Sequence, residues 1–148
     1  MPLTIAVVGA GYVGLVTAAC LASLEHDVVC IDRDAARIEV LRTGAVPIHE
    51  RGLDALVERG LATRRLRFSH DVADARDADV AFLAVGTPVG PDGAADVSAV
   101  LEAARAVGAA ARRPLVLVVK STVPIGTTHA ALAAARAEAV VPVHGCHN

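Results

Sequence analysis

Residues 3–32 read LTIAVVGAGYVGLVTAACLASLEHDVVCID. The apolar run before the first glycine is rich in β-branched residues and predicts a buried strand. Gly9, Gly11 and Gly14 then fit the pattern G-x-G-x-x-G at the start of an expected helix. A second apolar run ends at Asp32 and predicts a second strand. A strand, a glycine turn, a helix and a second strand in this order predict a βαβ unit with parallel strands.

Each glycine of the motif has a predicted role. Gly9 permits a tight turn, Gly11 lets the backbone approach a pyrophosphate, and Gly14 lets the helix pack closely on the strand. Tyr12 and Val13 would present backbone N–H groups at the positive end of the helix dipole. The pattern therefore predicts a binding site for the phosphates of a dinucleotide.

Asp32 is the predicted ligand of the adenosine ribose. It follows Gly14 at close to the spacing of about 20 residues that is expected for this acid. A carboxylate here accepts hydrogen bonds from the ribose hydroxyls and repels a 2′-phosphate, which favours NAD over NADP. Arg33 weakens that preference, because a nearby arginine can accommodate the phosphate. The alternative interpretation is that the glycines only form a turn and that Asp32 caps the next helix.

The rest of the chain continues the alternation of strands and helices. We expect strands at 3–8, 28–31, 66–69, 80–85, 115–119 and 140–143, and helices at 12–24, 34–42, 53–59, 96–112 and 126–138. Asp96 is the expected cap of the fourth of these helices. This order predicts an α/β fold, a Rossmann-type doubly wound parallel sheet. The length of 148 residues fits a single domain spanning 1–148.

Composition narrows the classes of partner. Hydrophobic residues make up 54% and aromatic residues 2% of the chain, so small aliphatic side chains must fill the core. The net charge of −2 favours neither nucleic acid nor an anionic membrane surface as a partner. Cys20, Cys30 and Cys146 are odd in number and widely spaced, which predicts no disulfide framework and no metal site. A reducing, cytoplasmic setting is expected.

The first 24 residues contain no charged side chain, which admits a membrane-spanning or export segment as an alternative. No lysine or arginine precedes the apolar run, and three glycines interrupt it. Both observations favour the soluble α/β interpretation over the membrane one.

Three further segments are more specific than the glycine motif. They are PIHERGL at 47–53, VGTPVGPDGAADVS at 85–98 and KSTVPIGT at 120–127. Together with the glycine motif, they resemble the signature set of the UDP-glucose/GDP-mannose dehydrogenase family over about residues 3–135. The sequence KSTVP at 120–124 is most similar to the UDP-glucose branch. The tail at about 140–148 diverges from the family pattern. Another Rossmann dehydrogenase, of short 3-hydroxy acids, does not explain the second and third segments.

The resemblance implies roles for residues at matching positions. The pyrophosphate of NAD would be held by Gly11, Tyr12, Val13 and Gly14, and its adenosine end would be lined by Asp32 and Arg37. The nicotinamide ribose would lie beside Val85, Gly86 and Thr87. The reacting centre would lie near Ser121 and Thr122. Thr122 would position a catalytic water.

Several of these residues have a purely structural alternative. Thr87 could belong only to a turn, and Ser121 and Thr122 could only cap a helix. Lys120 could be a solvated strand end. Glu50 also matches a family position, in the loop after the second helix.

Two local departures from the family pattern are visible. Glu25 stands where relatives often have Gly, at a helix end where a left-handed backbone is common. Arg51 stands where Pro is usual.

The large departure is length. Family members oxidise a sugar alcohol twice to a carboxylic acid, and the resemblance implies that their catalytic cysteine lies in later segments. The chain alone is therefore expected to bind NAD without turnover. Cys146, between two histidines, is expected to lie at a frayed terminus without a catalytic or metal-binding role.

Two further hypotheses remain open from the sequence. One is a non-catalytic nucleotide-binding module that regulates a partner, and the other is a degenerate fragment. If the family's second half is absent, uncovered apolar surface favours self-association.

Overall fold

A computed structural model describes residues 1–91 and 93–147, so Asp92 and Asn148 lie outside the described residues. The strands are β1 (Thr4–Val8), β2 (Asp27–Ile31), β3 (Leu66–Ser69), β4 (Val80–Leu83), β5 (Leu115–Val119) and β6 (Val143–His147). The helices are α1 (Tyr12–Ser23), α2 (Ala35–Arg42), α3 (Leu53–Ala62), α4 (Ser98–Ala110) and α5 (Thr127–Glu138), with a 3-10 turn η1 (Val72–Ala75).

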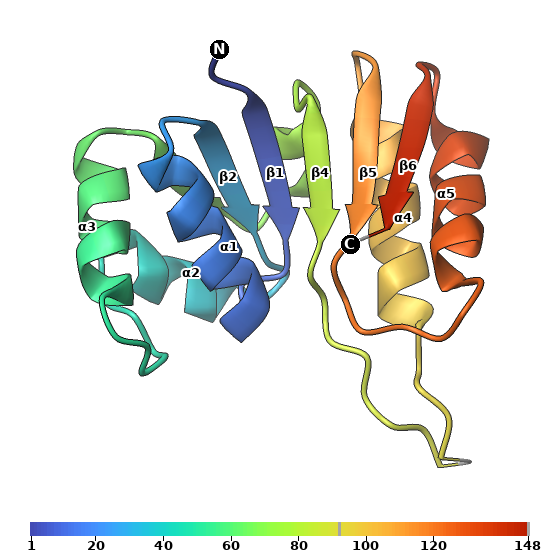
Figure 1. The fold of residues 1–148 in the computed structure, drawn as a ribbon, viewed down its shortest axis with the longest axis horizontal. Helices are drawn as coiled ribbons and strands as arrows, with labels where there is room; N and C mark the ends of the chain where they lie inside the picture. The colour runs from blue at the N-terminus through green and yellow to red at the C-terminus, as the bar shows by residue number, and fades with distance from the viewer. Residues whose placement is uncertain (92, 148) are drawn as a thin grey trace.

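The strands form one parallel sheet in the order β3-β2-β1-β4-β5-β6 (Figure 1). The order reverses between β1 and β4. Because each crossover is right-handed, this reversal sends later helices to the opposite face of the sheet. The predicted α/β, Rossmann-type doubly wound fold is confirmed.

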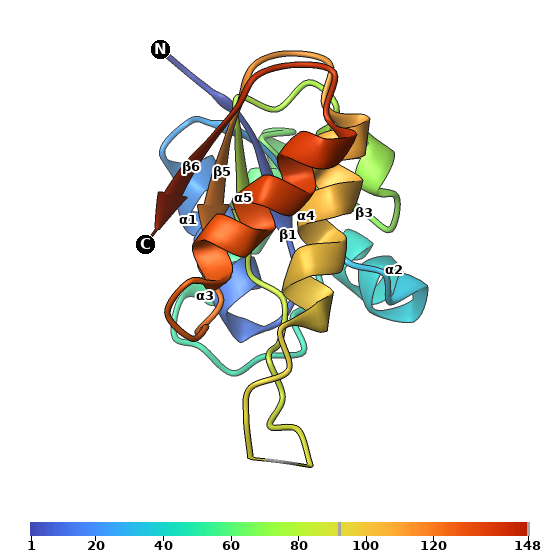
Figure 2. The ribbon, with the colours of Figure 1, turned by 90° about the vertical axis from the view of Figure 1, so that its right-hand side faces the viewer.

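The helices cover the sheet in two separate layers. α1, α2 and α3 pack on β1, β2 and β3, around a core that includes Leu15, Ile38 and Val57. On the other face, η1, α4 and α5 pack on a second core that includes Val100 and Ala131, and α4 and α5 lie side by side (Figure 2). Small side chains allow this close approach: a Cβ at Gly108 of α4 would lie 2.2 Å from the carbonyl oxygen of Ala135 in α5.

The last strand differs from its predicted position. β6 begins at Val143, whereas the expected strand spanned 140–143. Val140 is 91% exposed, and Pro142 has no N–H to donate to a sheet ladder. The carbonyl of Pro142 instead accepts from Leu115 N, after which β6 runs beside β5 to His147. Cys146 therefore lies in a paired strand, and the expectation of a frayed terminus was wrong.

The start of α4 also differs. Its cap position is Val97, so Asp96 is not the cap that the sequence predicted. The Asp96 carboxylate accepts from the N–H of Ser98 at 2.9 Å, two residues on, in a local turn that precedes the helix. Hydrogen bonds from the Ser98 hydroxyl and N–H lower the pKa of Asp96.

The departure at Glu25 has the expected backbone consequence. Its φ is 68°, in the left-handed region that glycine adopts at no steric cost. Among residues 1–91 and 93–147, no helix is long and apolar enough to cross a membrane.

Candidate functional site

The three motif glycines occupy different environments. Gly9 has a φ of 107°, and a Cβ there would lie 2.5 Å from the carbonyl oxygen of Ala84. A Cβ at Gly14 would lie 1.8 Å from the carbonyl oxygen of Gly9, so α1 touches the turn that precedes it. A Cβ at Gly11 would meet no atom within 4 Å. The turn thus leaves open space at Gly11, where the backbone is predicted to approach a pyrophosphate.

The first turn of α1 faces this space with backbone groups alone. Gly11 is the helix cap and has no side-chain hydrogen bond, and no acidic residue occurs in the first turn. The first helical hydrogen bond runs from Leu15 N to Gly11 O, at 2.9 Å. The N–H groups of Tyr12, Val13 and Gly14 therefore belong to a first turn that has no acceptor within the helix. This arrangement suits an anion.

Asp32 is held rigidly at the end of β2. Its Oδ2 accepts from Ala10 N at 2.8 Å, and its Oδ1 accepts from Asp34 N at 2.9 Å. Arg37 Nη1 donates to Oδ2 at 3.2 Å. The carboxylate therefore lies against the glycine turn, and its side chain is only 12% exposed.

Asp34, and not Asp32, caps α2. Its carboxylate accepts from the N–H of Arg37 at 3.0 Å. The alternative role of Asp32 as a helix cap is therefore excluded by the geometry. The Asp32 carboxylate instead lies beside a cleft at the carboxyl ends of the strands.

A cleft of about 820 Å³ opens along the carboxyl ends of the strands. This volume is within the range of small-molecule sites. Six of the predicted site residues line it: Gly9, Gly11, Asp32, Arg37, Val85 and Gly86. The opposite part of the wall was not predicted from the sequence; it includes His70, Asp71 and Val72 together with Ala99, Glu102 and Ala103 of α4.

The remaining predicted residues lie outside this cleft's lining. Tyr12, Val13 and Gly14 are in the first turn of α1, and Thr87, Ser121 and Thr122 follow β4 and β5. The segments after β4 and β5 meet through hydrogen bonds. The hydroxyl of Thr87 donates to the carbonyl of Thr122 at 2.8 Å.

Ser121 and Thr122 differ in accessibility. The Ser121 hydroxyl is buried and donates to the carbonyl of Val85 at 2.6 Å, so it joins the ends of the two strands. The Thr122 side chain is exposed. Neither residue caps α5, because the cap position is Gly126.

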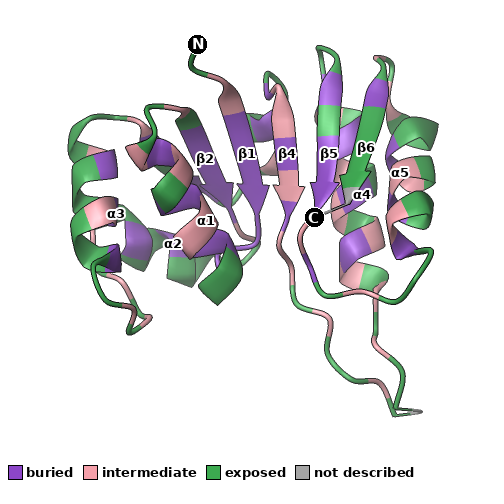
Figure 3. Cartoon of the chain, in the orientation of Figure 1, coloured by how far each residue is buried: buried purple, intermediate pink, exposed green. Residues whose placement is uncertain are grey.

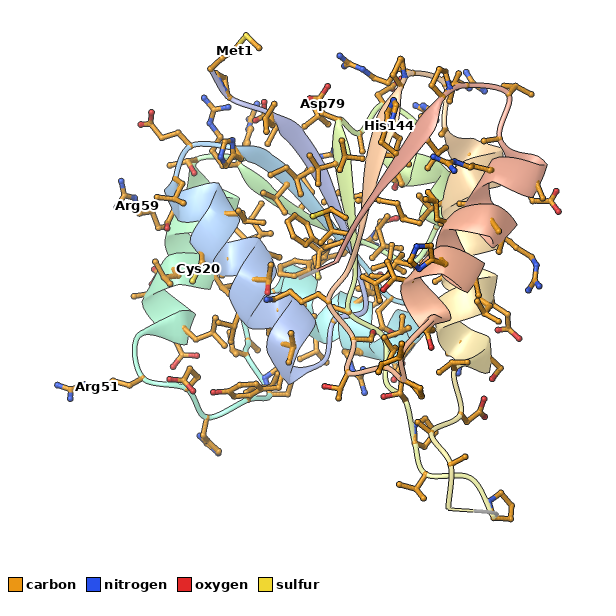
Figure 4. The ribbon with its side chains drawn as sticks, turned by 45° about the vertical axis from the view of Figure 1, so that its right-hand side comes forward. Met1, Cys20, Arg51, Arg59, Asp79 and His144 are labelled. Carbon is orange, nitrogen blue, oxygen red and sulfur yellow. The ribbon has the colours of Figure 1, made fainter. Side chains whose placement is uncertain are left out.

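Tyr12 makes one contact that the sequence did not suggest. Its hydroxyl donates to the Glu50 carboxylate in the loop before α3. This hydrogen bond, followed by the negative charge of Glu50, raises the pKa of Tyr12. The neighbouring Arg51 points away from the chain (Figure 4). Glu50 thus connects its loop to the first turn of α1.

The cysteines occupy three different environments. Cys30 is buried in β2, and burial, together with the charge of Asp32, raises its pKa to about 12. Cys20 is exposed on α1 and does not belong to the core. Cys146 is exposed on β6. Within the described part of the chain, no group of three or more His, Cys, Asp or Glu side chains is placed to hold a metal ion.

Comparison with known proteins places this site in a family. Residues 3–143 match the family model described as the NAD binding domain of the UDP-glucose/GDP-mannose dehydrogenase family. The chain belongs to the UDP-glucose/GDP-mannose dehydrogenase family. It is the NAD-binding domain of that family, and NAD is its cofactor.

Individual relatives agree with this assignment. The chain is 50% identical over 122 residues to a UDP-glucose 6-dehydrogenase of Pseudomonas aeruginosa, a match that covers 82% of this chain and 27% of that protein. A UDP-glucose 6-dehydrogenase of Rhizobium meliloti is 50% identical over 125 residues, covering 83% of this chain and 29% of that protein. The chain thus spans less than a third of the length of these relatives.

A solved structure extends the match to the whole fold. The UDP-glucose dehydrogenase of Pyrobaculum islandicum superposes with a TM-score of 0.95 at 41% identity. That match covers 100% of this chain and 36% of the Pyrobaculum chain.

Proposed function

We propose that this domain binds NAD⁺ across the carboxyl ends of its strands and presents it for the oxidation of UDP-glucose. The observation that carries the proposal is the open space at Gly11, which lies beside a carboxylate fixed at Asp32. We assign cofactor contacts to the predicted set: Gly9, Gly11, Tyr12, Val13, Gly14, Asp32, Arg37, Val85, Gly86, Thr87, Ser121 and Thr122.

The charges around Asp32 favour NAD⁺ over NADP⁺. A 2′-phosphate would meet the Asp32 carboxylate at the end of β2. Arg37 is already engaged by Asp32 and lies 3.9 Å from the Asp34 carboxylate, so it is not available to offset the repulsion. Arg33 lines the same cleft and reduces the preference without reversing it.

The substrate proposal depends on the relatives. Two relatives at 50% identity carry the name UDP-glucose 6-dehydrogenase, and the KSTVP segment at 120–124 favours that branch. NAD⁺ would accept hydride from the sugar. The exposed Thr122, at the end of β5, would position the water that this chemistry consumes.

Residues 1–148, as a single NAD-binding unit, are proposed to bind NAD⁺ without turnover. The matched region is 27% of the Pseudomonas enzyme, and the catalytic cysteine implied by the family resemblance lies beyond it. We place the protein in the cytoplasm and expect self-association through exposed apolar side chains.

The test is a titration of the purified chain with NADH, read by nucleotide fluorescence, beside Gly11→Ala. The new methyl group meets no protein atom, so the variant should fold and lose NADH affinity by about tenfold or more. Addition of NAD⁺ and UDP-glucose to the wild-type chain should produce no NADH absorbance. Unchanged affinity in a folded variant would contradict the phosphate site, and NADH formation would contradict the absence of turnover.

A further inference from the structure

A histidine lines the cleft, and the proposed cofactor contacts leave it unused. His70 directly follows β3, as Asp32 directly follows β2. The strand register pairs Ile31 with Ser69, and the N–H of Asp32 donates to the carbonyl of Ser69 at 3.0 Å. Asp32 and His70 therefore leave the sheet as neighbours, and both line the cleft.

The imidazole of His70 is free to meet a ligand. His70 is exposed, whereas β2 beside it is buried from Val28 to Ile31 (Figure 3). Within residues 1–91 and 93–147, no hydrogen bond or ion pair engages the His70 side chain. The fold thus gives this side chain no structural partner, although it lies beside the acid that is proposed to bind the ribose.

Charged groups from several segments face the same cleft, and carboxylates outnumber guanidinium groups among them. They are Asp32 after β2, Arg33 and Arg37 at the start of α2, Asp71 before η1, Asp96 before α4, and Glu102 of α4. Arg37 is already paired with Asp32. A further negative charge is therefore unfavourable in this cleft, and a positive charge at His70 would offset part of that cost.

NAD⁺ and NADP⁺ differ at the group that these neighbours would face. NADP⁺ carries a phosphate on the ribose hydroxyl that an acid such as Asp32 binds in NAD⁺. Histidine is the side chain that ordinarily changes charge between about pH 5 and 8. We infer that His70 sets how strongly the site discriminates against NADP⁺. The neutral imidazole leaves the repulsion by Asp32 intact, whereas the imidazolium pairs with the 2′-phosphate and reduces it. The inference rests on the proposed function of this cleft as a NAD⁺ site.

Arg33 is the competing determinant, because it lines the same cleft. An arginine keeps its charge throughout the range in which histidine titrates, so Arg33 alone would make no pH-dependent contribution. The 2′-phosphate itself gains a proton near about pH 6, which weakens its repulsion in any variant. The contribution of His70 is therefore the difference in pH dependence between the wild-type chain and a variant without the imidazole.

The test is calorimetric titration of the whole chain with NAD⁺ and with NADP⁺ in low salt, at pH 8 and at pH 6. Between these values, the ratio of the NADP⁺ Kd to the NAD⁺ Kd should fall about threefold further in wild type than in His70→Gln. His70→Arg should show the reduced ratio already at pH 8. His144→Gln is the matched control and should behave as wild type, because His144 is exposed on β6, an edge strand far from β2 in the sheet order (Figure 4).

Proton uptake provides a second readout. Titrations at pH 7 in two buffers of different ionisation enthalpy should show that NADP⁺ brings more protons onto wild type than onto His70→Gln, because proton and phosphate binding favour each other reciprocally.

Equal pH dependence of the Kd ratio in wild type and His70→Gln overturns the inference, and so does an unchanged ratio in His70→Arg at pH 8. A wild-type chain that binds NAD⁺ but shows no NADP⁺ binding at either pH also overturns it. A folded wild-type chain that does not bind NAD⁺ would instead contradict the proposed function.

Discussion

Gly9, Gly11 and Gly14 satisfy different physical requirements within one short motif. The first has a left-handed backbone, the last lacks space for a side chain, and Gly11 has neither constraint. All three could be predicted from the sequence because the order of strand, turn and helix fixes their roles. The contact between Tyr12 and Glu50 could not be predicted, because it depends on where the loop before α3 lies.

Gly14→Ala should destabilise the fold strongly. Its methyl group would lie 1.8 Å from a backbone carbonyl oxygen, and backbone shifts of this kind cost about 1–3 kcal/mol or more. Gly11→Ala should cost only about 1 kcal/mol, since it changes the cap without a clash. Urea unfolding of both variants measures the difference. Equal stability of the two would show that the close contact at Gly14 is not required.

The buried thiol of Cys30 should make stability depend on pH in alkali. Its folded pKa is raised to about 12, whereas an unfolded cysteine titrates near about 8.5. The thiol therefore contributes its full stability below about pH 8.5, and that stability is lost as the pH rises toward 12.

The measurement compares urea unfolding of wild type and Cys30→Ala at pH 8 and pH 10.5. Wild type should lose more stability than the variant between these values, because only its unfolded state can release the Cys30 proton. A parallel pH dependence in the two proteins would contradict the burial of this thiol.

At the scale of elements, the buried strands and amphipathic helices were predictable, whereas their ends were not. β6 was placed too early because Val140 and Val141 resemble a strand, while Pro142 delays the pairing. η1 was not predicted, since four residues are too few to show helical periodicity. Asp96 was assigned to the helix cap, but it closes a turn one residue earlier.

Two acidic residues near the start of α2 have different roles. Asp34 caps the helix, whereas Asp32 is the proposed ligand of the ribose. Asp34→Ala removes the cap of this helix and should cost about 1 kcal/mol of stability. NAD⁺ affinity should change little, because Asp32 keeps its hydrogen bond from Ala10. Thermal unfolding and calorimetric titration measure the two effects. A loss of affinity as large as that of Asp32→Ala would show that the cap and the ribose site are not separable.

At the scale of the whole molecule, the sequence predicted one side of the cleft and missed the other. The glycine turn and Asp32 are adjacent through one βαβ unit, so local order reveals them. His70 and Glu102 join the cleft only because the chain crosses the sheet between β3 and β4.

The central claim is that Asp32 and the glycine turn form an NAD⁺ site in this chain. Calorimetric titration of wild type and Asp32→Ala with NAD⁺ and with NADP⁺ tests it most directly. We expect wild type to bind NAD⁺ and to bind NADP⁺ at least about tenfold more weakly. Asp32→Ala should lose most NAD⁺ affinity while remaining folded. A folded wild-type chain that binds neither nucleotide, or binds both equally, would contradict the account.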